Sequence, residues 1–183
     1  MLTFLFRALP HFALCVLLYG QFLLPAHAAG GMQLQVAVEG DVLTCSASPT
    51  ALPDGLERAL REGSEISVNW HISVEIERKY WLNKSMGDIK LNRRVIPDLV
   101  SRSWLLEDQT SGITRRVFVL REATDFLTML QNFPVLDRSL LNAGQAYVVK
   151  VVAREREGDV QNSWWRAWLG GDNISASSGF TLP

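Results

Sequence analysis

The chain has 183 residues, a formal net charge of −1, 48% hydrophobic residues and 20% charged residues. This balance excludes a disordered polar chain, and the lack of net positive charge gives no global electrostatic basis for binding nucleic acid or an anionic membrane surface. The length suits one ordinary domain with a buried core.

The first 28 residues have the features of a secretory signal peptide. A single cation, Arg7, precedes an uncharged apolar run, and Ala26-His27-Ala28 then places small residues where signal peptidase requires them. An uncleaved membrane anchor is the less favoured alternative, because a proline and polar residues interrupt the run. We therefore expect cleavage near Ala28, a periplasmic or secreted location, and a single β-rich domain over residues 29–183.

Alternation of apolar and polar residues predicts strands in the first half of the mature chain. Residues 33–39 and 42–46 form an expected hairpin, and a change to helical spacing predicts a short amphipathic helix between Thr50 and Gly63. The clearest strand signal covers residues 66–76, where every second residue is apolar. We expect this strand to be half-buried.

Strands and turns continue through the second half. We expect an antiparallel partner that ends at Pro97, then a hairpin whose strands cover about 99–107 and 113–120. Two further strands are predicted over residues 145–153 and 174–182. No internal repeat or linker divides the mature chain.

A second helix is expected to begin at a Thr124 cap and to end at Pro134, with apolar residues at helical spacing between them. Many short strands, two helices and no regular β-α-β alternation indicate a mainly β (α+β) fold. The architecture that we predict is an antiparallel β-sandwich-like arrangement with two short helices.

Few residues of the mature chain suit catalysis. Cys45 is its single cysteine, which we expect to be buried rather than bridged. His71 is its single histidine and lies on the polar face of the predicted strand, where Ser73 or Glu75 would have to assist it as a base. Glu75 and Glu77 could pair as a glycosidase dyad or metal site, but a solvated strand face explains them better. We predict no catalytic residue, no metal and no cofactor.

Three tryptophans gather in one short segment near the end of the chain. The interpretation with functional content is a surface that docks a membrane or a protein partner, with a cation among the indoles. The alternative is a short helix or bulge that places the indoles in the core. The residues of this possible docking surface are Trp164, Trp165, Arg166 and Trp168.

Several of these segments together resemble a known family. They are the helical stretch 56–63 leading into strand 66–76, the sequence Arg78-Lys79-Tyr80-Trp81-Leu82, and the stretches 108–112, 126–130 and 140–147. In these the chain is similar to the domain of unknown function 4390 family of exported proteobacterial proteins. The resemblance implies an envelope location, a β-rich domain and an association with a membrane signalling system, and it brings no active residue.

The leading hypothesis is therefore an exported, non-enzymatic module that binds an envelope protein or the membrane surface, with no nucleic-acid partner and no assigned oligomeric state. Two alternatives from other classes stay open. One is a hydrolase or metal-assisted enzyme built from carboxylates on separate loops. The other is a carrier of a small apolar ligand between the sheets.

Overall fold

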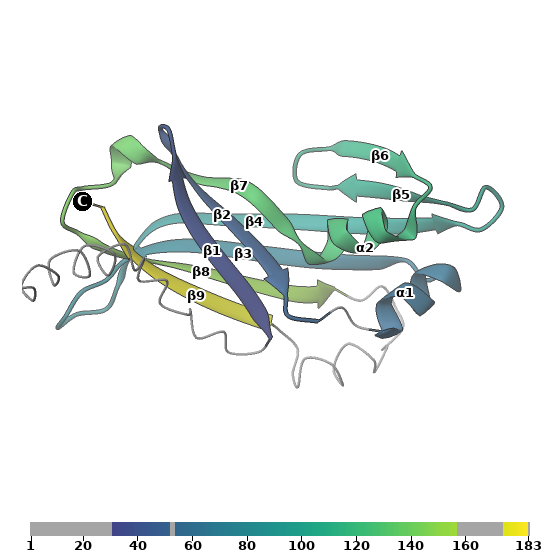
Figure 1. Cartoon of the computed structure of the whole chain (residues 1–183), viewed down its shortest axis with the longest axis horizontal. Helices are drawn as coiled ribbons and strands as arrows, with labels where there is room; N and C mark the ends of the chain where they lie inside the picture. The colour runs from purple at the N-terminus through teal and green to yellow at the C-terminus, as the bar shows by residue number, and fades with distance from the viewer. Residues whose placement is uncertain (1–30, 52–53, 157–173, 183) are drawn as a thin grey trace, which may run out of the picture.

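The computed structural model describes residues 31–51, 54–156 and 174–182. Within these residues the chain forms two antiparallel sheets and two α-helices, which confirms the mainly β, sandwich-like fold (Figure 1). The small sheet has the order β1 (Met32–Glu39), β2 (Val42–Pro49) and β7 (Leu130–Asp137). The large sheet has the order β6 (Ile113–Val117), β5 (Ser103–Asp108), β4 (Lys84–Asp98), β3 (Ile66–Ile76), β8 (Ala146–Arg156) and β9 (Ile174–Thr181).

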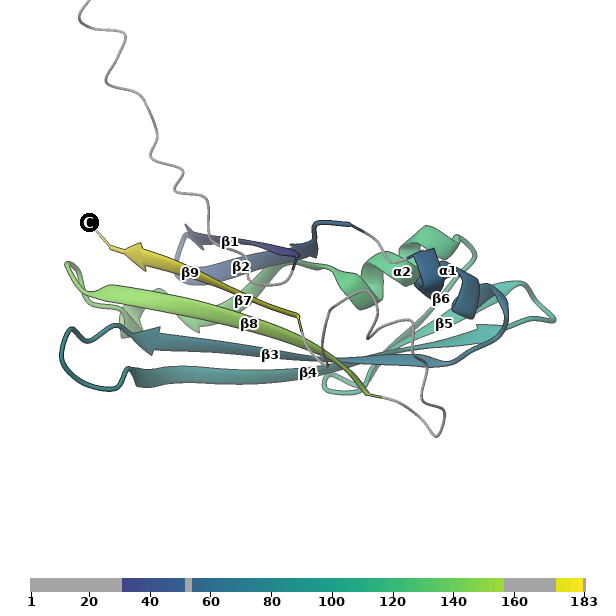
Figure 2. The same cartoon turned by 90° about the horizontal axis from the view of Figure 1, so that it is seen from below.

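The two sheets are stacked as layers. Helices α1 (Asp54–Arg61) and α2 (Leu120–Thr128) lie beyond one end of the small sheet, on the same side of the large sheet (Figure 2). A one-turn 3-10 helix, η1 (Arg138–Leu140), follows β7. The hydrophobic core therefore lies between the large sheet and a second layer that the small sheet and the helices build together.

Strict alternation along the central strand produces this core. In β3 the residues of one parity, from Ile66 through Trp70 to Val74, are buried, and the intervening polar residues are partly exposed. The neighbouring β8 repeats the pattern with Tyr147 and Val149. Because successive side chains of a strand point to opposite faces, one face of the large sheet is apolar and the other polar.

Two side chains of the large sheet hold the C-terminal end of α2. The last carbonyls of a helix have no partner within the helix and need donors from elsewhere. Trp70 Nε1 donates to Leu127 O at 3.2 Å, and Arg93 Nη1 donates to Phe126 O at 2.9 Å and to Met129 O at 2.6 Å. These bonds fix the helix to β3 and β4.

The predicted extent of the second helix is wrong. It runs from Leu120 to Thr128, so Thr124 is a buried residue inside the helix rather than its cap. Leu130 pairs with Ala47 and begins β7, because bonding to β2 outweighs the helical spacing of its apolar residues. Pro134 does not end a helix but lies within β7, an edge strand, beside a shift in register where a missing N–H is tolerated.

Two predicted strand boundaries are also corrected. The strand expected from residue 99 begins at Ser103, because Asp98 Oδ1 accepts hydrogen bonds from the backbone of Val100 and Ser101 and turns the chain. The strand expected over 113–120 ends at Val117, where the chain turns into α2.

The long hairpin of β3 and β4 lies at the centre of the large sheet. Its strands pair from Ile66 and Val95 to Ile76 and Lys84, with one irregularity between Val74 and Glu75. Its connecting loop lies at the end of the molecule that also holds the described C-terminus, far from α1 and α2 (Figure 1). This loop carries the candidate site.

Candidate functional site

The hairpin tip, which we define as residues 77–84, exposes three consecutive large apolar side chains. Tyr80 is 82% exposed, Trp81 is 80% exposed and Leu82 is 91% exposed. Apolar side chains scattered singly on a surface are ordinary, but contiguous ones mark sites that meet a partner or a membrane. The hairpin tip is therefore the strongest candidate for a binding surface among the described residues.

Cations surround this apolar apex. Arg78 and Lys79 precede it and Lys84 follows it, whereas Glu77 is the only acid of the tip. Three cations and one acid leave a local formal charge of +2 on a chain whose total is −1. The Lys79 ammonium lies 5.7 Å from the centre of the Tyr80 ring, within the range of a cation–π contact. Positive charge is thus concentrated where the apolar residues are exposed.

Hydrogen bonds hold the base of the tip in one conformation. The backbone N–H of Arg78 donates to Asn83 Oδ1 at 3.3 Å, and Asn83 Nδ2 donates to Glu75 Oε2 at 3.1 Å. The backbone N–H of Glu77 donates to Ala146 O at 3.0 Å, which joins the tip to the start of β8. The exposed apex therefore stands on an ordered base.

Glu75 links the tip to the sheet. Its Oε2 lies 2.7 Å from Lys150 Nζ on β8, and this contact and the bond from Asn83 lower the pKa of Glu75. Glu77 is exposed at the start of the tip. In residues 31–51, 54–156 and 174–182, no group of three or more histidine, cysteine or acidic side chains gathers as a metal site would require.

His71 lies on the polar face of β3, as its parity indicates. Its Nε2 contacts Asp88 Oδ1 on the neighbouring β4, so its partner is neither Ser73 nor Glu75, the two residues that its own strand offers. Among the described residues, no hydroxyl group hydrogen-bonds to the other ring nitrogen of His71, Nδ1. The pair is a cross-strand contact on an open sheet face.

The predicted docking residues Trp164, Trp165, Arg166 and Trp168 lie outside the described residues. Their role remains a prediction. Sequence patterns did not single out the hairpin tip as a site, although the signal was present: Tyr-Trp-Leu between two predicted strands, with cations on both sides. Apolar residues placed in a turn have no strand or helix face to bury them.

Comparison with protein-family models assigns residues 28–160 to the domain of unknown function (DUF4390). The match covers more than two thirds of the chain. The chain belongs to the DUF4390 family. No curated protein and no solved structure matches it.

The DUF4390 match includes the hairpin tip and ends before the tryptophan segment. The tip is therefore part of the family domain, whereas the segment from Trp164 to Trp168 follows it. Among the residues described for this DUF4390 protein, neither helix has the length and apolar character needed to cross a membrane.

Cys45 of this DUF4390 domain is buried in β2, as expected, and forms no disulfide. Burial raises the pKa of its thiol to about 11. Because the thiolate is the reactive form, we predict that iodoacetamide at pH 8 modifies Cys45 at least about 100-fold more slowly in the native protein than in urea.

The measurement uses a Cys15→Ser chain, whose single thiol is Cys45. A Gln35→Cys variant on the exposed face of β1 supplies the control, because its new thiol reacts at similar rates in both states. Equal native and denatured rates for Cys45 would contradict its burial.

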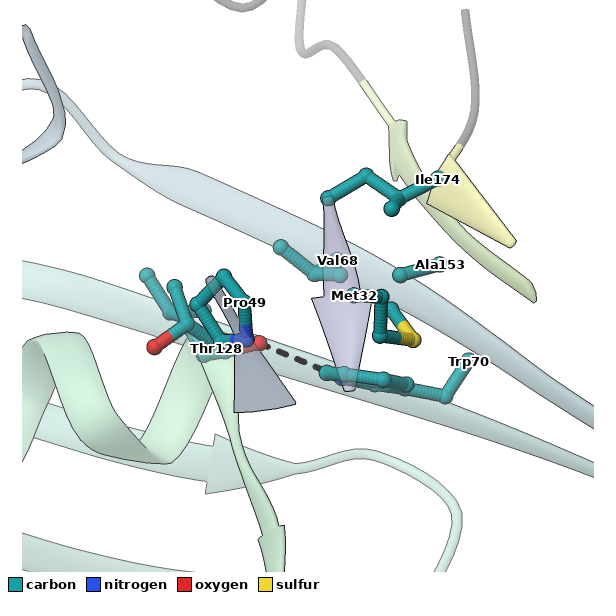
Figure 3. Close-up of a pocket in the computed structure, with 8 residues that line it drawn as sticks. Met32, Pro49, Val68, Trp70, Thr128, Ala153 and Ile174 are labelled. Atoms are coloured by element: carbon teal, nitrogen blue, oxygen red, sulfur yellow. Dashed lines mark hydrogen bonds between the residues drawn. The ribbon is translucent and has the colours of Figure 1, made fainter. Parts of the chain in front are cut away.

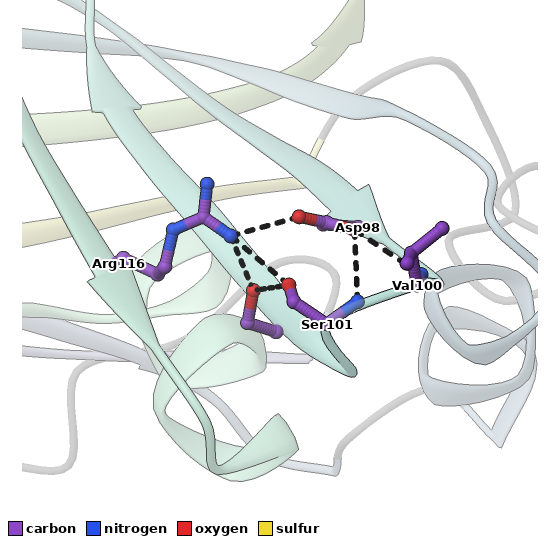
Figure 4. Close-up of polar contacts among 5 residues, drawn as sticks. Asp98, Val100, Ser101 and Arg116 are labelled. Carbon is purple, nitrogen blue, oxygen red and sulfur yellow. Dashed lines mark hydrogen bonds and ion pairs between the residues drawn. The ribbon is translucent and has the colours of Figure 1, made fainter.

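A polar cluster closes the β4–β5 turn at the opposite end of the large sheet from the tip. Arg116 Nη1 donates to Asp98 Oδ2 at 2.8 Å, to Ser101 Oγ at 3.0 Å and to Ser103 Oγ at 2.7 Å (Figure 4). Every member of the cluster comes from the turn or the strands beside it. The hydrogen bonds from Arg116 therefore hold the β4–β5 turn in place.

Asp98 should make stability depend on pH. The Ser101 hydroxyl, the Arg116 guanidinium and the Ser101 N–H lower the pKa of its carboxyl well below the ordinary value. A carboxyl with a lowered folded-state pKa stabilises the fold above its unfolded pKa, about 4, and that contribution fades as the pH falls further.

The difference in unfolding free energy between the wild type and Asp98→Asn should therefore shrink as the pH falls from about 5 to about 3, and it should go on shrinking at lower pH. Urea titrations across this range test the prediction. A difference between the two proteins that stays constant would contradict it.

A small apolar cavity lies between the layers. Met32, Val68, Trp70 and Ile174 contribute to its lining (Figure 3), and its volume is about 10 Å³. That volume accommodates about one water molecule, whereas small-molecule pockets measure roughly 300–1,000 Å³. In the structure described, this cavity is too small for the apolar ligand of the carrier hypothesis.

Proposed function

We propose that this DUF4390 protein is an exported, non-enzymatic binding module of the cell envelope, and that the hairpin tip is its docking element. The proposal rests above all on one observation: Tyr80, Trp81 and Leu82 are all at least 80% exposed at the end of an ordered hairpin. Leaving three large apolar groups in water is unfavourable, and a docking partner would bury them.

Three polar contacts among the described residues outside the apex support binding over catalysis. Glu75 bonds to Lys150, His71 contacts Asp88, and Arg116 of β6 bonds to Asp98 at the β4–β5 turn. A general base needs a reacting group within hydrogen-bond reach, whereas these contacts join neighbouring strands to one another. They contribute to the sheet rather than to a cleft.

In this proposal, residues 1–28 act as a signal peptide that directs export and is then cleaved. Residues 29–183 remain as the mature domain. Protein isolated from its own cells should then begin close to Ala29, as N-terminal sequencing can determine. A chain that retains Met1 in the envelope would contradict cleavage.

A photo-crosslinking amino acid placed at Leu82 tests the docking function in intact cells. We expect a reproducible adduct at this position. Val100 supplies the matched control, because it is 98% exposed in the β4–β5 turn, at the opposite end of the large sheet. The docking role fails if Leu82 gives neither a protein adduct nor a lipid adduct beyond those seen at Val100.

A further inference from the structure

We infer that the hairpin tip docks onto the headgroup region of an anionic phospholipid membrane. The inference rests on the proposed docking function and specifies its partner. The observations that support it are the order of residues along the tip, the local charge and the small area of the apex.

The apolar apex has the composition that suits a membrane interface. Tryptophan and tyrosine favour the headgroup level, because their rings are apolar while each carries a hydrogen-bond donor that stays hydrated. Leu82, the most exposed of the three, adds an aliphatic side chain that can enter the acyl boundary. The apex thus presents an aliphatic group beside two interfacial ones.

The cations of the tip supply the complementary charge. Arg78 and Lys79 flank the apex on one side and Lys84 on the other, so all three can lie over phosphate groups when the apex is inserted. A lysine or arginine close to an anionic bilayer strengthens binding by about fivefold at moderate salt. The chain as a whole is slightly acidic, so this attraction depends on local charge and on the orientation of the tip.

The area of the apex favours a membrane over a protein partner. One aromatic side chain buries about 150–250 Å² of surface when a partner covers it. The three side chains of the apex therefore offer roughly 500 Å² together. A stable protein–protein interface buries about 800 Å² on each partner and depends on complementary shape. A lipid surface adapts to a narrow convex tip and needs no such complementarity.

The ordered base lowers the cost of insertion. Glu77 is joined to Ala146, and Asn83 is joined to both Arg78 and Glu75, before any partner arrives. Pre-organisation of this kind reduces the entropy lost on binding. Because only the apex enters the membrane, the contact is peripheral and reversible.

Co-sedimentation with vesicles tests the inference. We expect the purified protein to bind vesicles of phosphatidylethanolamine and phosphatidylglycerol, and to bind phosphatidylcholine vesicles at least about tenfold more weakly. Trp81→Ser combined with Leu82→Ser should weaken binding to the anionic vesicles at least about tenfold. Arg78→Gln combined with Lys79→Gln should weaken it about 25-fold at low salt and much less at high salt.

Matched controls come from the other end of the protein. Val100→Ser removes an equally exposed apolar side chain, and Arg115→Gln removes an exposed cation on β6. Both should bind anionic vesicles like the wild type. Because every altered side chain is exposed, thermal unfolding midpoints should stay within about 2 °C of the wild type and show that each variant is folded.

Three outcomes would overturn the inference: equal binding to both kinds of vesicle, unchanged binding by the tip variants, or binding that disappears in Trp165→Ser combined with Trp168→Ser while the tip variants retain it. The photo-crosslink at Leu82 separates this failure from that of the proposed function. A protein adduct without vesicle binding would overturn the membrane partner and leave the docking function intact. Absence of both adduct and vesicle binding would remove both.

Discussion

Replacing Trp70 with alanine is expected to lower the free energy of unfolding by about 3–5 kcal/mol. Trp70 is 1% exposed at the centre of β3, and its removal leaves a cavity between the large sheet and α2. The indole N–H also bonds to Leu127 O, one of the carbonyls that α2 cannot satisfy itself. Both the lost apolar contacts and the lost donor act in the same direction.

Urea denaturation of Trp70→Ala and Trp81→Ala measures this effect with the same chemical change at two sites. Trp81 is 80% exposed, so its replacement should change stability by no more than about 0.5 kcal/mol. Trp70→Phe should fall between the two, because it retains an aromatic ring and loses the hydrogen bond to Leu127. Similar losses for Trp70→Ala and Trp81→Ala would show that the core is arranged differently.

Arg93→Met should cost about 2–4 kcal/mol, the second largest effect that the structure predicts. Arg93 faces the interior of the molecule, where its Nη1 bonds to the carbonyls of Phe126 and Met129 and its guanidinium lies 4.9 Å from the centre of the Phe126 ring. Burial lowers the pKa of Arg93, and nearby Asp108 opposes that shift. A positive charge at a helix C-terminus also interacts favourably with the helix dipole.

Arg94→Met is the matched control, because Arg94 is the next residue along β4 and faces the opposite side of the sheet. Its guanidinium lies 2.6 Å from Glu65 in a partly exposed ion pair, and such pairs contribute at most about 1 kcal/mol. Chemical denaturation should therefore separate the two variants clearly. Equal destabilisation would argue against the role of Arg93 at the end of α2.

The parts of the molecule that stabilise it and the part that we propose to dock lie far apart. Trp70 and Arg93 hold α2 near one end of the large sheet, whereas the hairpin tip lies at the other end (Figure 1). Variants of the tip should consequently change binding without changing stability. Variants of Trp70 and Arg93 should lower stability without changing binding, as long as the hairpin of β3 and β4 remains paired.

The local sequence pattern predicted the structure correctly where the burial of a residue depends only on its position within its own strand. The period of two in residues 66–76 identified β3 and its buried face, and the same parity placed His71 on the polar face. The final strand, predicted over residues 174–182, is observed as β9. The burial of Cys45 followed from residue type alone.

Tertiary contacts decided the features for which local signals pointed elsewhere. The apolar spacing from Phe126 to Phe133 favours a helix, yet pairing with β2 draws residues from Leu130 onward into β7. The partner of His71 is Asp88, 17 residues away along the chain, and only the register of β3 with β4 brings them together. The role of Arg93 likewise depends on α2 folding over the inner face of β4.

The hairpin tip combines both kinds of information. Its composition is local, so the sequence by itself determined a cationic segment with three apolar residues, just as it determined the mainly β fold and the buried parity of β3. Exposure is not local, because it depends on whether another element covers the loop. Only the tertiary structure decided that Tyr80, Trp81 and Leu82 stand exposed on an ordered base, since the hairpin carries them to the end of the sheet, away from the second layer.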